Sequence, residues 1–426
     1  MRTSGFLMIP LVLLLSVPVF AQLDDLIEGE YSSPRLNDVR ARAMGRTEIV
    51  NATGSNAIFY NPANIGMVQT KTLQAGGRVY MGTMNDEEYW DFYDDQDWEG
   101  KYKLHPKITH LSFAMPYQHP NSELKFAFGL GYNTYLDFGT KTNLEFTDKS
   151  GTPTYTRTRD VKVAGGLNTI SPAAALNIDD KYFLGLAFHK SVLGKLKFET
   201  DTDWNPDPGF VYTVNTVDEG KVSATFISLG ATGKLMAESQ LTVGVMYRSG
   251  FDLKFDDLEW SEEESDGTRN SDQYDPDNFE IKLPAIMGLG VSYQVSPEVI
   301  IAGEYQTRPF SDIEDEDGDK LDWIDNGSCY RIGMEYQSGS VPLRLGFFSD
   351  AILEVDYDNM GQSEEKPKSL SGFTGGIGFV SGNITLDFFG EYAFWGREDY
   401  GGPNNAKYEY KETLFAFGVT FTASME

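Results

Sequence analysis

Apolar and polar positions alternate along much of the chain, and residues 124–138 (LKFAFGLGYNTYLDF) show this most clearly. Every second residue from Leu124 to Phe138 is apolar or threonine, and the residues between them are mostly small or polar. A period of two puts each set on its own face of a β-strand and does not fit a helix. The run is also much longer than the five or six residues typical of a globular strand. It therefore predicts a long strand with one apolar face.

The same alternation recurs at 280–295 (EIKLPAIMGLGVSYQV) and at 414–421 (LFAFGVTF). In both segments one face is apolar and the other is small or polar. A soluble sandwich would bury the apolar face against a second sheet. A membrane barrel turns that face to lipid and keeps the small and polar face inside.

The lengths of the connections separate these two architectures. Short links are expected at 119–122, 179–180, 237–239, 296–297, 339–340 and 382–383. Long polar links are expected at 85–104, 140–159, 200–220, 256–279, 311–327, 354–369 and 397–407. Short turns that alternate with long loops, and an even number of strands, are typical of outer-membrane barrels. The pattern predicts an all-β protein, a 14-stranded antiparallel transmembrane β-barrel over residues 72–426.

The N-terminus reads as a secretory signal over residues 1–21, with Arg2, a short apolar run and small residues up to Ala21. No other segment reaches the length of an apolar membrane helix. The single cysteine, Cys329, excludes an internal disulfide framework. Residues 22–71 do not alternate and are too polar for lipid, so they are expected to fill the barrel lumen as a hatch.

A formal net charge of −29 makes the chain an unlikely match for nucleic acid, because phosphate binding needs clustered Lys and Arg. Much of this charge lies in the long links. The segment 312–325 (DIEDEDGDKLDWID) fails the EF-hand template, because placing Gly318 at the turn puts Ile313 and Ile324 at ligand positions. A solvated, self-repelling loop is expected, and loose binding of divalent cations at these acidic loops is the alternative.

No catalytic or cofactor motif is visible, so neither an enzyme nor a resident cofactor or metal is expected. The chain has four histidines, His105, His110, His119 and His189. The spacing of His105 and His110 puts them on opposite faces of a strand, where they cannot share a metal ligand.

One short stretch, 55–66 (SNAIFYNPANIG), interrupts the polar N-terminal region with a helix signal. Asn61 is expected to cap a turn, and Pro62 suits the first helical position, which needs no backbone N–H. Gly66 is a plausible end of that turn.

Residues 41–82, which contain the triplet Asn61-Pro62-Ala63 and lead into the first strand, resemble the hatch and first strand of the FadL family of outer-membrane transporters. The segments 282–306 and 330–350 resemble late hairpins of that family. The resemblance implies a hatch that rearranges on ligand binding, passive uptake of hydrophobic molecules such as long-chain fatty acids, and lateral release through the barrel wall. It also leaves a second role open, because PorV-like members of the family serve protein secretion.

These expectations assign hypothetical roles to several residues. Asn61, Pro62 and Ala63 form the hatch motif. The candidates for lining an apolar ligand site near the hatch are Ile58, Phe59, Ile65 and Met67, with anchoring of the hatch to the wall as the alternative. Gly129 and Gly131 are candidates for a kink in the third strand that gates lateral release, or for small residues that give the hatch room.

The partners expected are outer-membrane lipids and a hydrophobic small molecule. The expected location is the Gram-negative outer membrane, with both chain termini in the periplasm. The pattern carries no information on the oligomeric state or on which hydrophobic compound is bound.

Overall fold

The structure is a computed structural model that describes most of the chain. The described residues are 38–90, 93–102, 106–118, 124–138, 140–148, 155–207, 210–236, 240–264, 269–270, 278–315, 317–356, 365–401 and 406–425. The expected signal peptide at 1–21 and the first part of the expected hatch, residues 22–37, lie outside them, as do His105 and His119.

Four short helical elements come first, and the chain after them is mostly strand. The helical elements are α3 (Val39–Ala43), α4 (Glu48–Asn51), η1 (Gly54–Phe59) and η2 (Pro62–Met67). The strand segments are β1 (Lys71–Trp90), β2 (Tyr93–Tyr102), β3 (Lys107–Gln118), β4 (Lys125–Asp137), β5 (Thr140–Asp148), β6 (Tyr155–Ile178), β7 (Tyr182–Ser191), β8 (Lys195–Asp207), β9 (Phe210–Ser223), β10 (Thr225–Leu235), β11 (Leu241–Arg248), β12 (Phe251–Glu264), β13 (Arg269–Asn270), β14 (Phe279–Leu283), β15 (Ile286–Ser296), β16 (Val299–Arg308), β17 (Gly327–Ser338), β18 (Val341–Ala351), β19 (Ser369–Ser381), β20 (Ile384–Gly401) and β21 (Ala406–Met425). A further helical turn, η4 (Phe310–Asp312), lies between β16 and β17.

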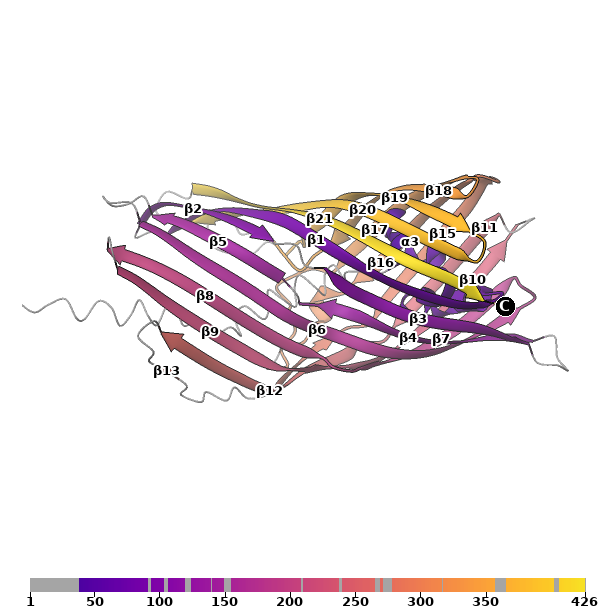
Figure 1. The fold of residues 1–426 in the computed structure, drawn as a ribbon, viewed down its shortest axis with the longest axis horizontal. Coiled ribbons are helices and arrows are strands. Elements are labelled where there is room, and N and C mark those ends of the chain that lie inside the picture. The colour runs from indigo at the N-terminus through magenta and orange to yellow at the C-terminus, as the bar shows by residue number, and fades with distance from the viewer. Residues whose placement is uncertain are drawn as a thin grey trace, which may run out of the picture.

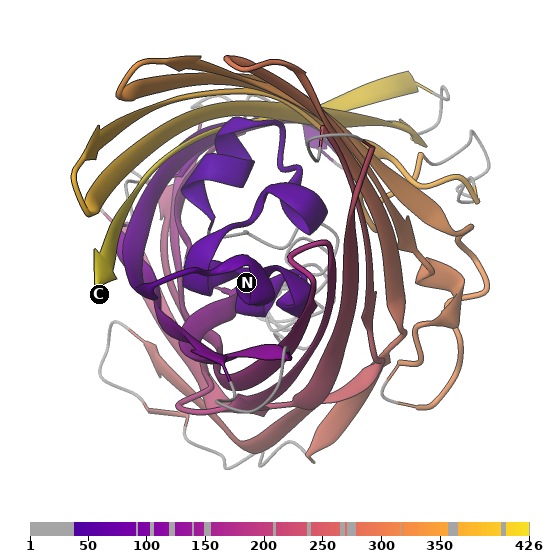
Figure 2. The same cartoon turned by 90° about the vertical axis from the view of Figure 1, so that its right-hand side faces the viewer.

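These segments form one closed antiparallel barrel (Figures 1 and 2). Some consecutive segments form a single barrel strand, because they pair with the same neighbouring strands. These sets are β2–β3, β4–β5, β7–β8, β9–β10, β11–β12 and β13–β14–β15. β1 pairs with β21 from Lys71–Met425 to Asn85–Lys411 and closes the sheet. The predicted 14-stranded barrel is confirmed.

Several links that the sequence predicts to be loops are instead β-strand, so the barrel strands extend further at this end than expected. β1 runs to Trp90 and β2 starts at Tyr93, while β8 ends at Asp207 and β9 starts at Phe210. The expectation of long loops there was wrong. Polarity suggested loops, but Thr, Val and Tyr, as in YTVNTV at 212–217, favour strand.

In the half of the barrel with the short turns, the faces are as the alternation predicts. Phe415 and Phe417 are exposed on the outside, while Ala416 and Thr420 are buried toward the lumen. An exposed apolar surface of this extent on a closed barrel suits lipid. No helix among the described residues is long and apolar enough to span a membrane.

In the other half the faces are reversed. Leu136 and Phe138 are 1% exposed, and Ile281 and Leu283 are buried as well, although the alternation predicted all four to face lipid. The reversal occurs where strands are irregular, at the register shift of β4 between Thr134 and Leu136 and at the break between β14 and β15 at residues 284–285. Outside the bilayer the apolar face must turn inward, because water replaces lipid.

The reversed faces build an apolar core inside the long-strand half of the barrel. Its buried members are Leu136, Phe138, Val163, Leu167, Leu196, Phe198, Val222, Ala224, Phe226, Phe251, Leu253, Phe255, Leu258, Ile281, Leu283, Ile286, Phe310, Ile313, Ile324, Ala351, Leu353 and Val355. The lumen is therefore lined differently in its two halves.

The acidic segment 312–325 takes part in this core. Ile313 and Ile324 are 3% and 2% exposed, and the Asp315 carboxylate accepts backbone hydrogen bonds from Asp317 and Asp319. The expected solvated loop is thus anchored by two apolar side chains. Within the described part of the chain, no three His, Cys, Asp or Glu side chains are arranged to hold a metal ion.

Candidate functional site: the hatch in the barrel lumen

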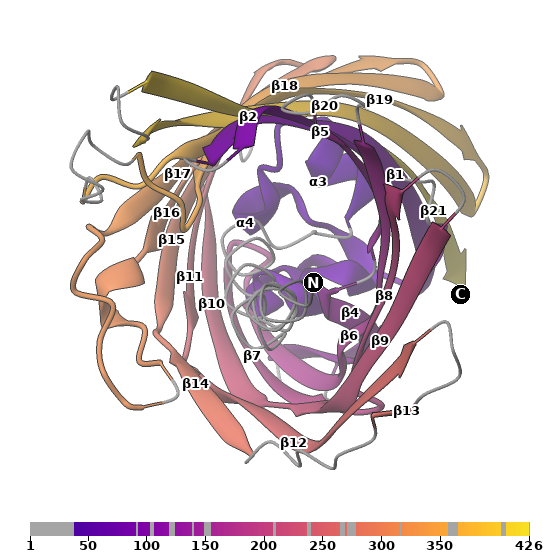
Figure 3. The same ribbon diagram turned by 90° about the vertical axis from the view of Figure 1, so that its left-hand side faces the viewer.

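The helical elements from α3 to η2 lie inside the barrel, as the end views show (Figures 2 and 3). Residues 38–70 are called the hatch below. Most of its side chains from Asp38 to Gly66 are buried. The hatch contacts the wall in two ways. η1 and η2 contact β1, β3, β4, β6, β7 and β10 (the neutral side). α3 and α4 contact β11, β15, β16 and β18–β21, and Arg40 of α3 binds Glu335 of β17 (the arginine side).

The Asn61-Pro62-Ala63 triplet begins η2 as predicted, although the turn is a 3₁₀ helix. The Asn61 side-chain oxygen accepts from the Ala63 N–H at 3.2 Å, and Pro62 occupies the first turn. The Asn61 amide donates to the Ile49 carbonyl at 2.9 Å and to the Thr232 hydroxyl at 3.0 Å. The cap thus also ties η2 to α4 and to the wall.

Two wall glycines make room for this triplet. A Cβ atom at Gly185 would overlap the Pro62–Ala63 peptide, and one at Gly230 would overlap the Asn61 side chain. Other lumen-facing glycines where an added Cβ would crowd the hatch are Gly129, Gly131, Gly244, Gly288, Gly290, Gly333, Gly346 and Gly376. The small residues of the inner face therefore let the hatch backbone approach the wall closely.

Three of the four predicted ligand-lining residues pack against the wall. Ile58, Phe59 and Ile65 are 0%, 4% and 0% exposed. They form one cluster with Ala127, Ala173, Ala175 and Ala187 of the wall. In this closed arrangement they anchor the hatch, which was the alternative reading. Met67 instead lines a polar cavity, described below.

The two glycines proposed as a gate also serve the hatch. A Cβ at Gly129 would lie 2.7 Å from Cδ1 of Ile58, and one at Gly131 would lie 2.5 Å from Cζ of Phe59. β4 pairs without interruption with β3 and β6 at both glycines. The expected kink at these positions is therefore absent. The β4–β6 register shifts further along, between Thr134 and Leu136.

On the arginine side, two hatch guanidinium groups share one wall carboxylate. Arg42 and Arg46 each bind Glu391 through two hydrogen bonds of 2.8–3.1 Å, and Arg46 also binds Asp350 at 2.8 Å. All four side chains are at most 3% exposed. Gly45, with φ +68°, and Arg46, with φ +64°, make the left-handed bend that directs these side chains.

The same network continues into the wall. Arg331 binds Asp350 and, at 2.8 Å, Glu304, and Glu304 accepts the backbone N–H of Ile49 at 2.7 Å. A second branch starts at Arg40, which forms a two-bond pair with Glu335 at 2.9 Å.

Arg344 extends that branch by joining Glu335 to Asp387, with both distances 2.6 Å. Paired guanidinium and carboxylate groups in two-bond geometry fix the hatch orientation more strictly than apolar packing does. The sequence reasoning missed this network. Its only signal was charged residues at lumen-facing positions of the late strands.

Two carboxyl groups of the hatch are buried, and hydrogen bonds and nearby positive charges offset only part of their loss of hydration. Burial raises the pKa of Asp38 to about 6, although its carboxylate caps α3 at the Ala41 N–H. Burial also raises the pKa of Glu48 well above its usual value, and one carboxyl oxygen of Glu48 has no hydrogen-bond partner among the described residues. Ionisation of either group therefore opposes docking of the hatch.

An aromatic cluster lies next to η1 at the start of the apolar core. Phe226 stacks between Phe251 and His189, with ring centroids 4.7 and 4.6 Å away, and Tyr135 lies 4.7 Å from it. Arg248 donates to the Tyr135 hydroxyl at 3.0 Å and to the Phe59 carbonyl at 3.2 Å. Arg248 is 4% exposed, and its Nε has no partner among the described residues. One guanidinium thus links the aromatic cluster to the hatch.

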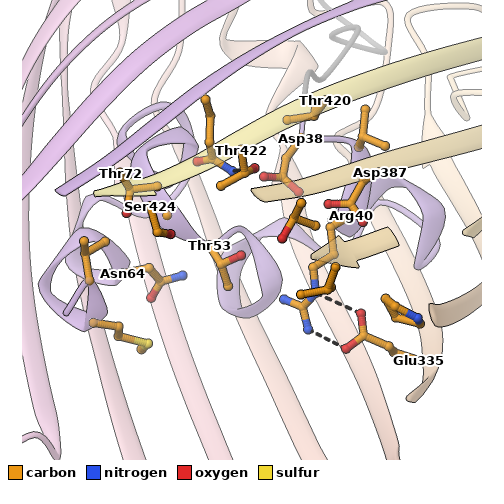
Figure 4. A pocket seen from close by; sticks show the side chains of 18 of the residues that line it. Asp38, Arg40, Thr53, Asn64, Thr72, Glu335, Asp387, Thr420, Thr422 and Ser424 are labelled. Atoms are coloured by element: carbon orange, nitrogen blue, oxygen red, sulfur yellow. Dashed lines mark hydrogen bonds and ion pairs between the residues drawn. The ribbon is translucent and has the colours of Figure 1, made fainter. Parts of the chain in front are cut away.

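At the short-turn end a polar cavity of about 440 Å³ separates part of the hatch from the wall (Figure 4). The wall contributes hydroxyl groups, among them Thr420 and Thr422, and the hatch contributes Asp38, Arg40 and Met67. A cavity of this size lined by polar groups has room for ordered water. The hatch is therefore packed against most of the wall but separated from it by this cavity beside β20, β21 and β1.

The comparisons agree with this architecture. The profile of the outer membrane protein transport protein family (OMPP1/FadL/TodX) matches residues 35–340, more than half of the chain. The chain belongs to this family, and it is an outer-membrane transport protein. No curated protein sequence matches it significantly.

Solved structures of the same fold cover nearly all of the chain at low identity. A FadL homologue of Pseudomonas aeruginosa is 11% identical with a TM-score of 0.58, covering 91% of this chain and 98% of that one. The toluene transporter TodX of P. putida is 14% identical with a TM-score of 0.56, with the same coverage. The toluene transporter TbuX of Ralstonia pickettii is 13% identical with a TM-score of 0.53, again covering 91% and 98%.

Proposed function

We propose that this protein passively carries hydrophobic molecules across the outer membrane, and that it does so by moving the neutral side of its hatch. The observation that carries the proposal is the reversal of the lumen lining. The long-strand half is apolar inside, so a hydrophobic molecule loses water contact as it enters. Relatives named as toluene transporters support this substrate class.

Within this proposal, the aromatic cluster is the last site that the hydrophobic molecule binds before it reaches the hatch. Tyr135, Phe226 and Phe251 offer ring faces, and Arg248 offers a buried guanidinium whose Nε has no partner among the described residues. A carboxylate that draws Arg248 away would remove its hydrogen bond to the Phe59 carbonyl. Binding of an amphipathic acid, such as a long-chain fatty acid, would thereby loosen η1.

The hatch motif sets how η2 responds. Asn61 holds η2 to Ile49 and Thr232, so the Asn61-Pro62-Ala63 turn controls release of the hatch rather than assembly of the barrel. The wall strands pair with one another through backbone hydrogen bonds that do not involve the hatch. Pro62→Gly is expected to leave the barrel folded and to alter ligand release.

We place the lateral exit near the shifted pairing rather than at Gly129 and Gly131. β4 and β6 lose register between Thr134 and Leu136. Next to this shift, the Asp137 carboxylate is bound by Arg78 at 2.9 Å and by Lys107 at 2.7 Å. These two ion pairs would hold the wall shut, and Asp137→Asn would weaken both.

The orientation that fits this route puts the long strands outside the cell and the short turns, with the C-terminus, in the periplasm. The chain end lies with the short turns, since the Ser424 N–H donates to the Asn383 carbonyl at 2.8 Å. Outer-membrane barrels generally have short turns on the periplasmic side.

Binding of oleate and of toluene to the purified protein, by calorimetry and by tryptophan fluorescence, tests the function. Arg248→Gln is expected to weaken oleate binding tenfold or more and to leave toluene binding nearly unchanged, because only oleate has a carboxylate. Absence of binding by either compound contradicts the proposal. A secretion role predicts instead that a stoichiometric protein partner co-purifies from native membranes with no lipid in the lumen.

A further inference from the structure

A band of exposed lysines crosses the outside of the barrel where its faces reverse. Its members are the exposed Lys162, Lys190, Lys195, Lys221, Lys254 and Lys282, together with the partly exposed Lys197. They lie on β6, β7, β8, β9, β12 and β14, which are neighbours in the barrel (Figure 3). The group is called the lysine band below.

The lysine band borders the lipid-facing surface directly. On β7 the outward residues Leu186 and Phe188 are 48% and 43% exposed, and the next outward residue is Lys190. On β15 Met287 is 58% exposed, and Lys282 lies just beyond the break on β14. Each of these strands thus passes from apolar to charged within a few residues. The band therefore marks the boundary between the hydrocarbon core and the headgroups.

Two lysines lie side by side at the centre of the band. Lys195 and Lys221 are directly opposite each other in the β8–β9 register. Their side chains are 57% and 72% exposed. Like charges at directly opposite positions destabilise a sheet. An anion between them would remove this repulsion.

Lys190 completes a group of three with these two. It lies opposite Thr225, and Thr225 and Lys221 are outward residues of neighbouring segments of one barrel strand. Lys190 has no acidic partner among the described residues. The other two lysines pair with exposed acids. Lys195 lies 3.2 Å from the Glu219 carboxylate, and Lys221 pairs with Asp257. Exposed ion pairs of this kind are weak, so a phosphate group can displace them.

We propose that Lys190, Lys195 and Lys221 bind the phosphate groups of a phosphorylated glycolipid in the surrounding leaflet. The apolar surface below the three lysines receives the acyl chains, and the lysines receive the phosphates. The assignment to the outer leaflet rests on the proposed orientation of the barrel, whereas phosphate binding by the three lysines does not depend on the transport function. The interaction also offsets repulsion between an anionic leaflet and a chain with a net charge of −29.

The test is native mass spectrometry of the detergent-purified protein titrated with lipid A that carries two phosphates. The variant is Lys190→Gln/Lys195→Gln/Lys221→Gln. The matched control is Lys71→Gln/Lys125→Gln/Lys181→Gln, which removes three lysines at the short-turn end. Heat-modifiable gel mobility reports whether each barrel is folded.

We expect the wild type and the control to bind the lipid, and the band variant to bind it about ten- to a hundredfold more weakly, since a lysine near a charged lipid surface contributes roughly fivefold. Lipid A without phosphates should bind to all three proteins equally weakly. Equal affinity of the band variant and the wild type overturns the proposal, as does equal loss in the control. Displacement of the lipid by millimolar inorganic phosphate would show a free-phosphate site and would overturn the lipid assignment. A defect in oleate or toluene binding is not expected in the band variant, so this test and the test of transport fail independently.

Discussion

The two sides of the hatch are held to the same barrel by different physics. On the arginine side, Arg42 and Arg46 share Glu391 in a buried network of ion pairs. On the neutral side, Ile58 and Phe59 pack on small wall residues, with hydrogen bonds from amide side chains. A buried ion pair is strongly directional and costly to break, whereas small-residue packing allows sliding at modest cost. In the proposed mechanism the arginine side therefore stays in place and the neutral side moves.

The largest expected effect comes from breaking the arginine side. Glu391→Gln leaves two buried guanidinium groups without their shared carboxylate, and removal of one member of a buried pair costs about 3–5 kcal/mol. The hatch should undock while the barrel remains folded. Trypsin cleavage after the hatch arginines, compared with heat-modifiable mobility, measures both.

The control for this prediction is Glu280→Gln, which removes an exposed acid paired with Lys254. It should not change the rate of trypsin cleavage. If Glu391→Gln is as resistant as the wild type, the network does not hold the hatch.

The second prediction concerns a substitution that overpacks the neutral side. Gly131→Val places side-chain atoms where the Phe59 ring lies, and overpacking of this kind costs about 1–3 kcal/mol. Faster amide exchange is expected in η1 but not in α3. Gly390→Val is the matched control, because its Cβ would lie outside at an ordinary 3.5 Å from Phe417. Unchanged exchange in η1 would contradict close packing at Gly131.

The third prediction removes the cap of η2. Asn61→Ala loses the bond from the Ala63 N–H and the two bonds donated to Ile49 and Thr232, at a cost of roughly 1–2 kcal/mol. Hydrogen exchange should rise in η2 and the barrel should fold normally. Barrel misfolding in this variant would show that the motif serves assembly.

The smallest expected effect is a pH dependence. The pKa of docked Asp38 is about 6 against an ordinary value of 3.8, so its contribution is fully present below pH 3.8 and is lost as the pH rises through 6. Arg40 and Asp387 are the charged neighbours that act on it.

Between pH 5 and pH 7 this group changes hatch stability by about 1 kcal/mol, with tighter docking at pH 5. Glu48 acts in the same direction, so Asp38→Asn should reduce the pH dependence without removing it. Amide exchange in α3, corrected for intrinsic rates, provides the measurement. A slope identical to that of the wild type would exclude Asp38 as its source.

Much of the wall could be predicted because a period of two is a local property. Residues 415–421 face as the alternation indicates, and the Asn61-Pro62 cap forms where the side-chain chemistry suggested. The reversal at Leu136 and Ile281 could not be predicted, because a register shift in β4 and a break between β14 and β15 change the face without changing the spacing of apolar residues.

The ion-pair network of the hatch could not be predicted from local sequence patterns for another reason. Arg42 and Glu391 are 349 residues apart in the sequence, and only closure of the barrel brings them together. Likewise, Ile58 and Phe59 are apolar in the sequence whether they line a ligand site or anchor a hatch. In the structure both pack on Ala127 and Ala173, as anchoring requires, and a role in ligand binding stays a prediction.

The most direct test of the account is transport through a protein whose neutral side is fixed. A Cβ added at Gly66 would lie 3.4 Å from that of Ala175, close to disulfide geometry, so Gly66→Cys/Ala175→Cys can tie η2 to β6. The comparison variant Ala43→Cys/Gly376→Cys ties α3 to β19, where an added Cβ at Gly376 would lie 2.5 Å from that of Ala43, so α3 must shift outward slightly for the disulfide to form. Uptake of oleate into proteoliposomes should stop in the oxidised η2–β6 variant and return on reduction, while the α3–β19 variant transports in both states. Unchanged uptake by the oxidised η2–β6 variant, or arrest in the α3–β19 variant alone, would contradict the account.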